Sequence, residues 1–198
     1  MNEKIFYHIH KIQSSNMEKI WKVGNTINVG KEYNYFFKLS REFEPKFSQI
    51  DDVQNVPWNN VYMYYKENSR LTKENTYRLL ENASCIISEY QMLIREIVYE
   101  NVREKEFNYL PSRQRCIWLC KEEQLEFWKR NIGGTFKVFK VKIGGNAFKS
   151  NNDLIVKPSE SYNKIEEMAK KYWSYNKKVE NEKDEYLYIG SLEILEEL

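Results

Sequence analysis

The last strand-like stretch of the chain decides its fold, and it reads Glu185-Tyr186-Leu187-Tyr188-Ile189-Gly190-Ser191-Leu192-Glu193-Ile194-Leu195. It follows the polar, charged residues 174–184, and its aromatic and branched side chains are typical of a buried strand. Glu185 heads this strand, so we expect its carboxylate to be held rigidly at the mouth of a buried element. Glu185 is therefore the first candidate functional residue.

A second strand is predicted at the opposite end of the chain, where residues 4–12 alternate between two faces. One face carries the only two histidines of the sequence, His8 and His10, together with Phe6 and Ile12. The other face carries Ile5, Tyr7 and Ile9. The two ends of the chain thus supply the titratable side chains that we consider first.

Between these strands the sequence predicts a mixture of helices and strands. Residues 72–107 have apolar side chains at helical spacing without Gly or Pro, which predicts a long helix with a solvated polar face at Glu81, Glu89, Arg95, Glu96, Glu100 and Arg103. Further strands are expected at 116–120 and 135–143, the latter with Lys140 and Lys142 on a solvated face, a short strand or ordered loop at 21–30, and helices at 34–43, at 121–131 and from a capping Ser159 onward. Pro45 and Pro57 bracket an irregular region.

These elements predict a single α+β domain over residues 1–198, with the helical segment at about 72–107 as an insert. Aromatic residues make up 15% of the chain, which favours a sheet-rich core. Thirty-one Lys and Arg against 29 Asp and Glu leave a net charge of +2, so no strong field points to nucleic acid or to a membrane surface. There is no signal-peptide-like or membrane-spanning apolar run, and the three cysteines lack a framework spacing, so we expect a cytoplasmic protein.

Common catalytic motifs are missing from the sequence, which contains no Walker-type phosphate loop, no Gly-x-Ser-x-Gly elbow and no His-Glu-x-x-His. What remains is an ordered set of short pieces: Phe6-Tyr7-His8-Ile9-His10, then Cys116-Ile117-Trp118-Leu119-Cys120 ahead of a helix, then Phe139-Lys140-Val141-Lys142-Ile143-Gly144, and finally Asp184-Glu185-Tyr186-Leu187-Tyr188. In this order they resemble the ADP-ribosyltransferase superfamily, in the style of its poly(ADP-ribose) polymerase and diphtheria-toxin branch. The chain also resembles uncharacterised bacterial proteins of that fold.

This resemblance implies a split antiparallel β-sheet and a site for NAD. His8 takes the place of the histidine that meets the NAD ribose, and Glu185 takes the place of the catalytic acid. The cofactor-binding candidates are Tyr7, Ile9, His10, Arg113, Trp118, Phe127 and Trp128. Among these, Trp118 stands where the family has a tyrosine, Ile9 stands where it has a glycine, and Phe127 or Trp128 is the aromatic that stacks on nicotinamide.

The chemistry fits these residue types. Cleavage of the bond between ribose and nicotinamide passes through an oxocarbenium-like state, which a fixed carboxylate such as that of Glu185 stabilises. A neutral histidine can hydrogen-bond a ribose hydroxyl, and aromatic faces can clamp a planar leaving group. The expected activity is NAD-dependent mono-ADP-ribosyl transfer or NAD hydrolysis, with His8 selected over His10 only by the resemblance.

Other readings stay open. The substitutions at Trp118 and Ile9 favour a non-catalytic module of the same fold that binds a nucleotide, an RNA end or a protein. Arg113, with Arg115 beside it, can pair with a ligand phosphate or lie at the surface, and Tyr7 and Tyr109 can line the same cleft or belong to the core and rim. If their strands are neighbours, a zinc site can form from His8, His10, Cys116 and Cys120, and either cysteine is a weaker candidate for a catalytic thiol.

Overall fold

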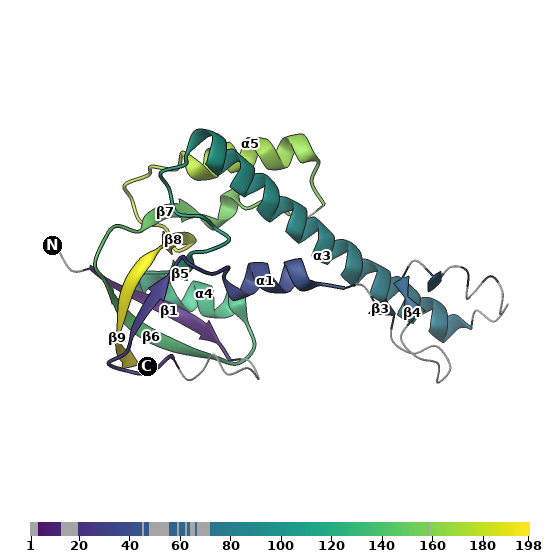
Figure 1. The fold of residues 1–198 in the computed structure, drawn as a ribbon, viewed down its shortest axis with the longest axis horizontal. Helices are drawn as coiled ribbons and strands as arrows, with labels where there is room; N and C mark the ends of the chain where they lie inside the picture. Colours follow the sequence, from purple (N-terminus) through teal and green to yellow (C-terminus); the bar gives the residue numbers. More distant parts are fainter. Residues whose placement is uncertain are drawn as a thin grey trace.

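Two antiparallel sheets form the body of the protein in the computed structural model, which describes residues 4–12, 20–44, 46–47, 56–58, 60–61, 63, 66, 72–157 and 159–198 (Figure 1). The larger sheet has the order β1-β6-β9-β2, with bounds Lys4–Lys11, Phe136–Ile143, Gly190–Glu197 and Thr26–Val29. The smaller sheet has the order β5-β8-β7, with bounds Ile117–Leu119, Asp184–Tyr188 and Phe148–Asn151. A separate two-stranded sheet pairs β3 (Lys46–Phe47) with β4 (Val56–Pro57).

The two main sheets meet at one point between β1 and β5. Tyr7 and Cys120 form an isolated antiparallel bridge, in which each backbone N–H donates to the other carbonyl oxygen at 2.9 Å. The bridge therefore joins the two sheets by backbone hydrogen bonds, and their buried side chains also share one core cluster. Mixed helices and antiparallel strands confirm the expected α+β class.

Helices cover one side of the smaller sheet. The described helices are α1 (Tyr35–Glu42), α3 (Lys73–Glu106), α4 (Leu125–Ile132) and α5 (Tyr162–Trp173), with short 3₁₀ turns η2 (Glu122–Gln124) and η3 (Asn152–Leu154). Figure 1 shows α5 and the C-terminal half of α3 beside the smaller sheet, while the N-terminal half of α3 extends away from the body. No helix among the described residues is long and apolar enough to cross a membrane.

The long helix predicted at 72–107 is confirmed, and its ends are capped by the residues at those positions. The Thr72 side chain accepts from the backbone N–H of Asn75 at 3.1 Å, which satisfies one of the free donors of the first turn. At the other end the Phe107 N–H donates to the Arg103 carbonyl. The short helix predicted at 34–43 is also confirmed, as α1.

The strands predicted at 4–12 and 135–143 are confirmed as β1 and β6, which pair along their whole length from Lys4↔Ile143 to Lys11↔Phe136. Lys140 and Lys142 of β6 are not simply solvated. Lys142 lies 3.4 Å from Glu193 on β9, and Lys140 lies 4.0 Å from Glu196. These cross-strand pairs use the lysines to match the acidic C-terminal strand.

The single strand predicted at 185–195 is wrong, because the stretch forms two strands that lie in different sheets. β8 belongs to the smaller sheet and β9 to the larger one, and the chain changes sheets at Gly190. Gly190 has a φ of 138°, and a Cβ at this position would lie 2.6 Å from the Tyr188 hydroxyl oxygen. Only glycine fits this turn without strain, and alternation of side chains along the sequence does not reveal such a switch.

Smaller differences concern element ends. The helix expected from Ser159 begins at Tyr162, and its cap is Ser161, whose hydroxyl accepts from the Lys164 N–H. The helix expected at 121–131 is a 3₁₀ turn followed by α4, and β7 was not predicted. Pro45 lies outside the described residues, and Pro57 lies in the short strand β4.

The smaller sheet separates two of the core clusters. One cluster lies between the two sheets and includes Phe6, Phe139, Tyr186 and Tyr188. The other lies between the smaller sheet and helices α3 and α5, where Leu187 packs with residues of both helices. Because β8 is buried along its entire length, its alternate side chains enter the two different clusters. Glu185 lies on the same face of the strand as Leu187, toward the helices.

Candidate functional site

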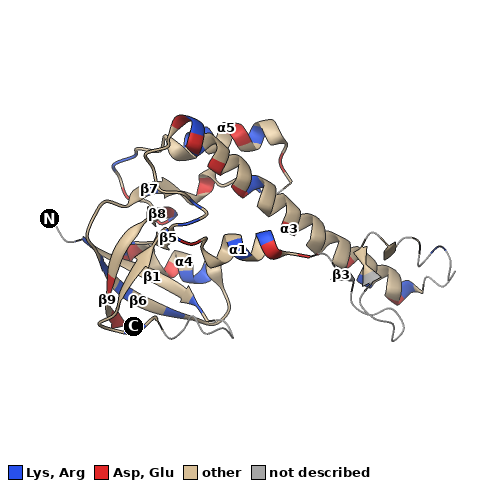
Figure 2. Ribbon diagram, in the orientation of Figure 1, with Lys and Arg blue, Asp and Glu red and all other residues tan. Residues whose placement is uncertain are grey.

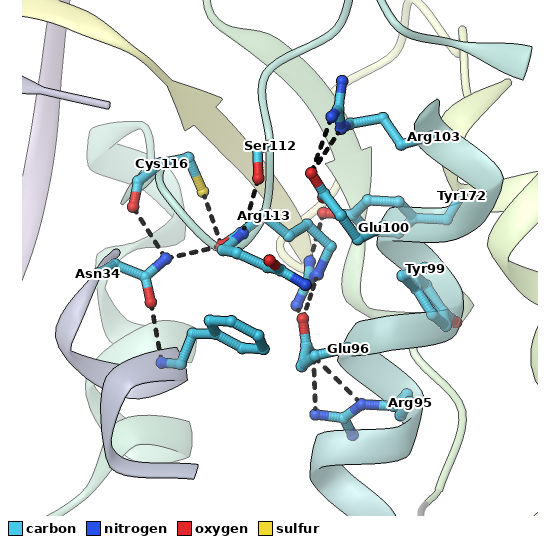
Figure 3. A network of polar contacts seen from close by, with 12 residues as sticks. Asn34, Arg95, Glu96, Tyr99, Glu100, Arg103, Ser112, Arg113, Cys116 and Tyr172 are labelled. Atoms are coloured by element: carbon cyan, nitrogen blue, oxygen red, sulfur yellow. Dashed lines mark hydrogen bonds and ion pairs between the residues drawn. The ribbon is translucent and has the colours of Figure 1, made fainter. Parts of the chain in front are cut away.

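A cluster of buried charges lies between the smaller sheet and helices α3 and α5, with Arg113 at its centre (Figure 3). The Nε of Arg113 donates to Oε2 of Glu96 at 3.0 Å, and its Nη1 donates to Oε1 of Glu185 at 2.8 Å. The same Nη1 donates to the Tyr172 hydroxyl at 2.6 Å, and that hydroxyl donates in turn to Oε1 of Glu185. Arg113 and Glu185 are each only 5% exposed. The carboxylate of Glu185 is thus held by two partners inside the protein.

Four separate segments bring these groups together. Glu96 lies on the inner face of α3, Tyr172 in the last turn of α5, Glu185 at the second position of β8, and Arg113 in the turn before β5. The contact between Arg113 and Glu185 spans 72 positions of sequence. Such a cluster exists only when the sheet and both helices are packed.

Asn34, the N-cap of α1, fixes the turn that carries Arg113. Its side-chain amide donates to the carbonyl oxygens of Arg113 at 2.6 Å and Cys116 at 3.2 Å (Figure 3). Its side-chain oxygen accepts from the backbone N–H of Phe37 at 3.0 Å, which caps the helix. One side chain therefore couples the start of α1 to the backbone of the charged cluster.

The charges of the cluster balance. Arg95 lies 3.2 Å from Glu96, so two guanidinium groups face the two carboxylates of Glu96 and Glu185. Burial alone would raise the pKa of Glu96, but the charges of Arg113 and Arg95 hold it below its usual value. Burial likewise opposes the charge of Arg113, and Glu96, Tyr172 and Glu185 together raise the Arg113 pKa well above its usual value. Glu96 and Arg113 therefore remain ionised.

Aromatic rings surround the guanidinium. The Cζ of Arg113 lies 4.9 Å from the ring centre of Tyr172, 5.7 Å from that of Trp118 and 5.8 Å from that of Tyr99. These distances allow cation–π attraction, which is stronger where water is excluded. Burial raises the pKa of Tyr172 well above its usual value, so its hydroxyl stays protonated and donates to Glu185.

A second buried pair continues the cluster along α3. Nε and Nη2 of Arg103 donate to Oε1 of Glu100 at 3.0 and 2.8 Å. Within the part of the chain that the structure describes, Glu100 Oε2 is the buried side-chain polar atom that lacks a hydrogen-bond partner. The prediction that the polar face of α3 is solvated is thus wrong at Glu96, Glu100 and Arg103, because the fold turns this end of the face toward the sheet.

His8 and His10 lie on β1 of the larger sheet, and their rings pack against Trp21 of the core cluster between the two sheets, away from the charged cluster. The His8 ring stacks on Trp21 with ring centres 4.5 Å apart, and its Nδ1 donates to the Trp118 carbonyl oxygen at 2.9 Å. The His10 ring lies 4.9 Å from that of Trp21. Burial lowers the pKa of His8 from 6.5 to about 4, so the ring is neutral at physiological pH.

Strand register explains why His8 and Glu185 are separated. Tyr7 pairs with Cys120 and Leu119 pairs with Tyr186, and paired residues of antiparallel strands share a face. His8 follows Tyr7 and Glu185 precedes Tyr186, so the two side chains point to opposite faces. The structure therefore does not bring the two catalytic candidates into one cleft, whereas it brings Arg113, Trp118 and Glu185 together.

The remaining candidates lie around α4. The Tyr7 hydroxyl donates to Glu122, and Ile9 is buried with Cys120 in a third core cluster. The indole N–H of Trp128 donates to the Asp184 carbonyl oxygen at 3.0 Å, and the Phe127 ring packs edge-on against Trp128. The Trp128 contact anchors α4 to the start of β8, next to Glu185.

Cys116 and Cys120 are buried at the two ends of β5. Burial raises the pKa of Cys120 to about 12 and that of Cys116 well above its usual value, so neither thiol ionises readily. Among the described residues no group of three or more His, Cys, Asp and Glu side chains is placed to hold a metal ion. Arg115 lies apart from the cluster, over the ring of Tyr33.

An open hollow of about 740 Å³ lies at the edge of the smaller sheet. It is lined on one side by residues 109–111 and 146–149 and on the other by the loop before β8 and by Tyr186. Three tyrosines and three lysines face it: Tyr109, Tyr175, Tyr186, Lys149, Lys177 and Lys178. The Tyr186 hydroxyl donates to Glu180, and Lys149 lies 3.6 Å from Asp184, whereas Lys177 and Lys178 are exposed.

The sequence predicted only some of these residues. The sequence marks Arg113, Trp118 and Glu185 as candidates, but it predicts a solvated face for Glu96, an apolar stripe for Tyr172 and a connecting loop for residues 174–184. The hollow had one sequence signal, the aromatic and lysine run at residues 175–178, which spacing alone does not separate from an ordinary loop.

Fold and site define an α+β protein with two antiparallel main sheets joined by one bridge and a buried ion cluster on the helical side of the smaller sheet. The chain belongs to the family described as "Protein of unknown function (DUF2441)", whose model matches residues 6–198. No curated protein matches the chain.

Proposed function

We propose that this protein is a non-catalytic nucleotide-binding module of ADP-ribosyltransferase-like architecture, with NAD or ADP-ribose as the class of ligand. The two antiparallel sheets joined at one bridge support the architecture, since the resemblance implies a split antiparallel sheet. The observation that carries the proposal is the enclosure of Glu185. Its carboxylate is 5% exposed and bonded to Arg113 and Tyr172, on the face away from His8.

The open hollow supports a nucleotide as the ligand. Its volume of about 740 Å³ lies in the range of small-molecule and cofactor sites, roughly 300 to 1,000 Å³. Tyrosine faces can stack on a base, and exposed Lys177 and Lys178 can neutralise a diphosphate. Lys149 is already close to Glu180 and Asp184, so it contributes less net charge.

Titration calorimetry with NAD and with ADP-ribose tests the proposal. We expect both ligands to bind wild-type protein, and the double substitution Lys177→Ala with Lys178→Ala to weaken binding about tenfold, because two phosphate contacts are lost. The matched control replaces Lys164 and Lys170, two exposed lysines of α5 outside the hollow, and should bind as the wild type does. If neither NAD nor ADP-ribose binds the wild-type protein, the proposal is excluded.

A second candidate, NAD turnover, is favoured by one contact pattern. Arg113, Trp118 and Glu185 lie together on one face, as a ribose-binding acid with an aromatic neighbour requires. For Glu185 to act on a ribose, its bonds to Arg113 and Tyr172 would have to open. Release of nicotinamide by wild-type protein that Glu185→Gln abolishes would establish this activity, whereas binding without release supports the module.

A further inference from the structure

We propose that two copies of this chain associate through an apolar stripe on the projecting part of α3, with the two helices antiparallel. The stripe consists of Leu80, Ala83, Ile87, Tyr90, Ile94 and Ile97. Its five large side chains are exposed, by 61% at Leu80, 55% at Ile87, 42% at Tyr90, 47% at Ile94 and 41% at Ile97. Contiguous apolar surface of this kind marks an interaction site more often than isolated exposed residues do.

The stripe lies beside the face that α3 packs against its own body, and its residue Tyr90 also touches the Phe43 ring of the body. The inner face is formed by other positions, which include Ile86, Glu96, Tyr99 and Arg103. Stripe residues instead alternate at separations of three and four, which is the a/d pattern of a heptad repeat. A repeat of 3.5 residues keeps a seam facing another helix, so this pattern, although only about two and a half heptads long, fits a helical partner.

Charge is sparse at the centre of the stripe. Residues 80–97, which span the stripe, contain four charged residues, Glu81, Glu89, Arg95 and Glu96, of which only Glu89 lies between positions 82 and 94, and the stripe is flanked on its solvent side by Ser84 and Gln91. Figure 2 shows the middle of α3 with little blue or red, although this part of the helix extends from the body. Depletion of charge is the compositional mark of the centre of an interface. Two copies of the stripe can therefore meet without like charges opposing one another.

Side-chain sizes select a second copy in the antiparallel direction. With the two-fold axis between Ile87 and Tyr90, each Ile87 lies opposite Tyr90 of the partner subunit, and each Ala83 lies opposite Ile94 of the partner subunit. Small and large side chains then complement one another, and the helix dipoles oppose. A parallel pair would place Ala83 against Ala83 and Tyr90 against Tyr90, which leaves a void at one level and crowds the other.

The neighbouring helix α1 enlarges the surface. A stripe of 18 residues is about 27 Å long. Since a stable interface needs roughly 800 Å² from each partner, we expect the apolar surface next to the stripe to take part as well. Phe36 and Leu39 of α1 are 37% and 51% exposed, and α1 packs against α3. The Phe43 ring just after α1 meets the Tyr90 ring with centres 5.9 Å apart, so the two apolar surfaces are adjacent.

Sedimentation velocity of the full chain from about 1 to about 100 µM tests the association. We expect wild-type protein to reach about twice its 24.1 kDa mass. Ile87→Glu places a charge at the centre of the stripe and should leave a monomer with unchanged circular dichroism and Tm, since Ile87 is exposed. Ser88→Glu adds the same charge at the next, exposed position and should still form the dimer. A monomeric wild type, or a dimer that survives Ile87→Glu, overturns the proposal.

Disulfide cross-linking tests the direction, in a background where Cys85 is replaced by Ser. Ala83→Cys and Ile94→Cys proteins should cross-link to each other when mixed. Each alone should stay uncross-linked, because antiparallel helices separate identical positions. Cross-linking within Ala83→Cys alone would show parallel helices and overturn the antiparallel arrangement.

Discussion

Replacement of Arg113 by Met tests whether the charged cluster is a structural unit. The substitution removes a guanidinium that donates to Glu96 at 3.0 and 3.3 Å, to Tyr172 at 2.6 Å and to Glu185 at 2.8 Å. Glu96 keeps Arg95, but Glu185 is left buried without a cation. Removing one partner of a buried ion pair costs about 3–5 kcal/mol. For a chain of this length that corresponds to a fall in Tm of roughly 6–20 °C.

The matched control is Arg115→Met, two positions along the same turn. Arg115 is only partly buried, and its Nη1 donates to the Lys31 carbonyl oxygen, so we expect a cost below about 1 kcal/mol. Urea unfolding followed by circular dichroism measures both. If Arg113→Met costs no more than Arg115→Met, the buried pairs do not stabilise the fold as we argue.

A double substitution identifies the cause of the cost. Arg113→Met combined with Glu185→Met removes the unpaired carboxylate together with the guanidinium, and apolar replacement of both partners is often nearly neutral. We therefore expect the double variant to be more stable than Arg113→Met alone. In the wild type the charges of Arg113 and Arg95 hold the Glu96 pKa below its usual value, so the stability that Arg113 supplies through Glu96 is lost as the pH falls, and the destabilisation by Arg113→Met should shrink at low pH. A double variant as unstable as the sum of its parts would refute the electrostatic explanation.

Three further predictions follow from titration and packing. Because burial lowers the pKa of His8 to about 4, the contribution of His8 to the free energy of unfolding is fully present above pH 6.5 and is lost as the pH falls toward 4. Unfolding measured at several pH values should therefore show that the free energy of unfolding of His8→Asn falls less over this range than that of the wild type, by about 1–3 kcal/mol. A thiol reagent should modify exposed Cys85 rapidly in the native protein and buried Cys116 and Cys120 only on unfolding, and rapid modification of all three would contradict their burial. Gly190→Ala should lower stability by roughly 1–3 kcal/mol in thermal unfolding, because its φ of 138° strains any side chain, and an unchanged Tm would argue against the sheet switch.

Local patterns along the sequence were sufficient for most elements. The long helix is marked by uninterrupted helical spacing between Thr72 and Phe107, and both residues are its caps in the structure. The alternation of residues 4–12 and 135–143 predicted β1 and β6 and their faces. These features depend on neighbours three or four positions away or on alternate positions, which is information that the sequence contains.

The charged cluster could be predicted only in part. The residue types and sequence neighbours of Arg113, Trp118 and Glu185 mark them as candidates. Nothing in the sequence distinguishes their partner Glu96 from any other acid on the polar face of a helix. Whether that acid meets solvent or Arg113 depends on how α3 rotates against the sheet, and this is set by packing with α5. No local pattern encodes that rotation.

The sequence by itself determined the mixed class, the strands at residues 4–12 and 135–143 and the long helix. Only the tertiary structure decided that the last stretch divides at Gly190 between two sheets and that His8 and Glu185 face apart. The physical reason is that the face of each side chain follows from strand pairing, and the pairs Tyr7↔Cys120 and Leu119↔Tyr186 join residues more than 60 positions apart. A shift of one residue in either pair would have placed the two candidates on one face.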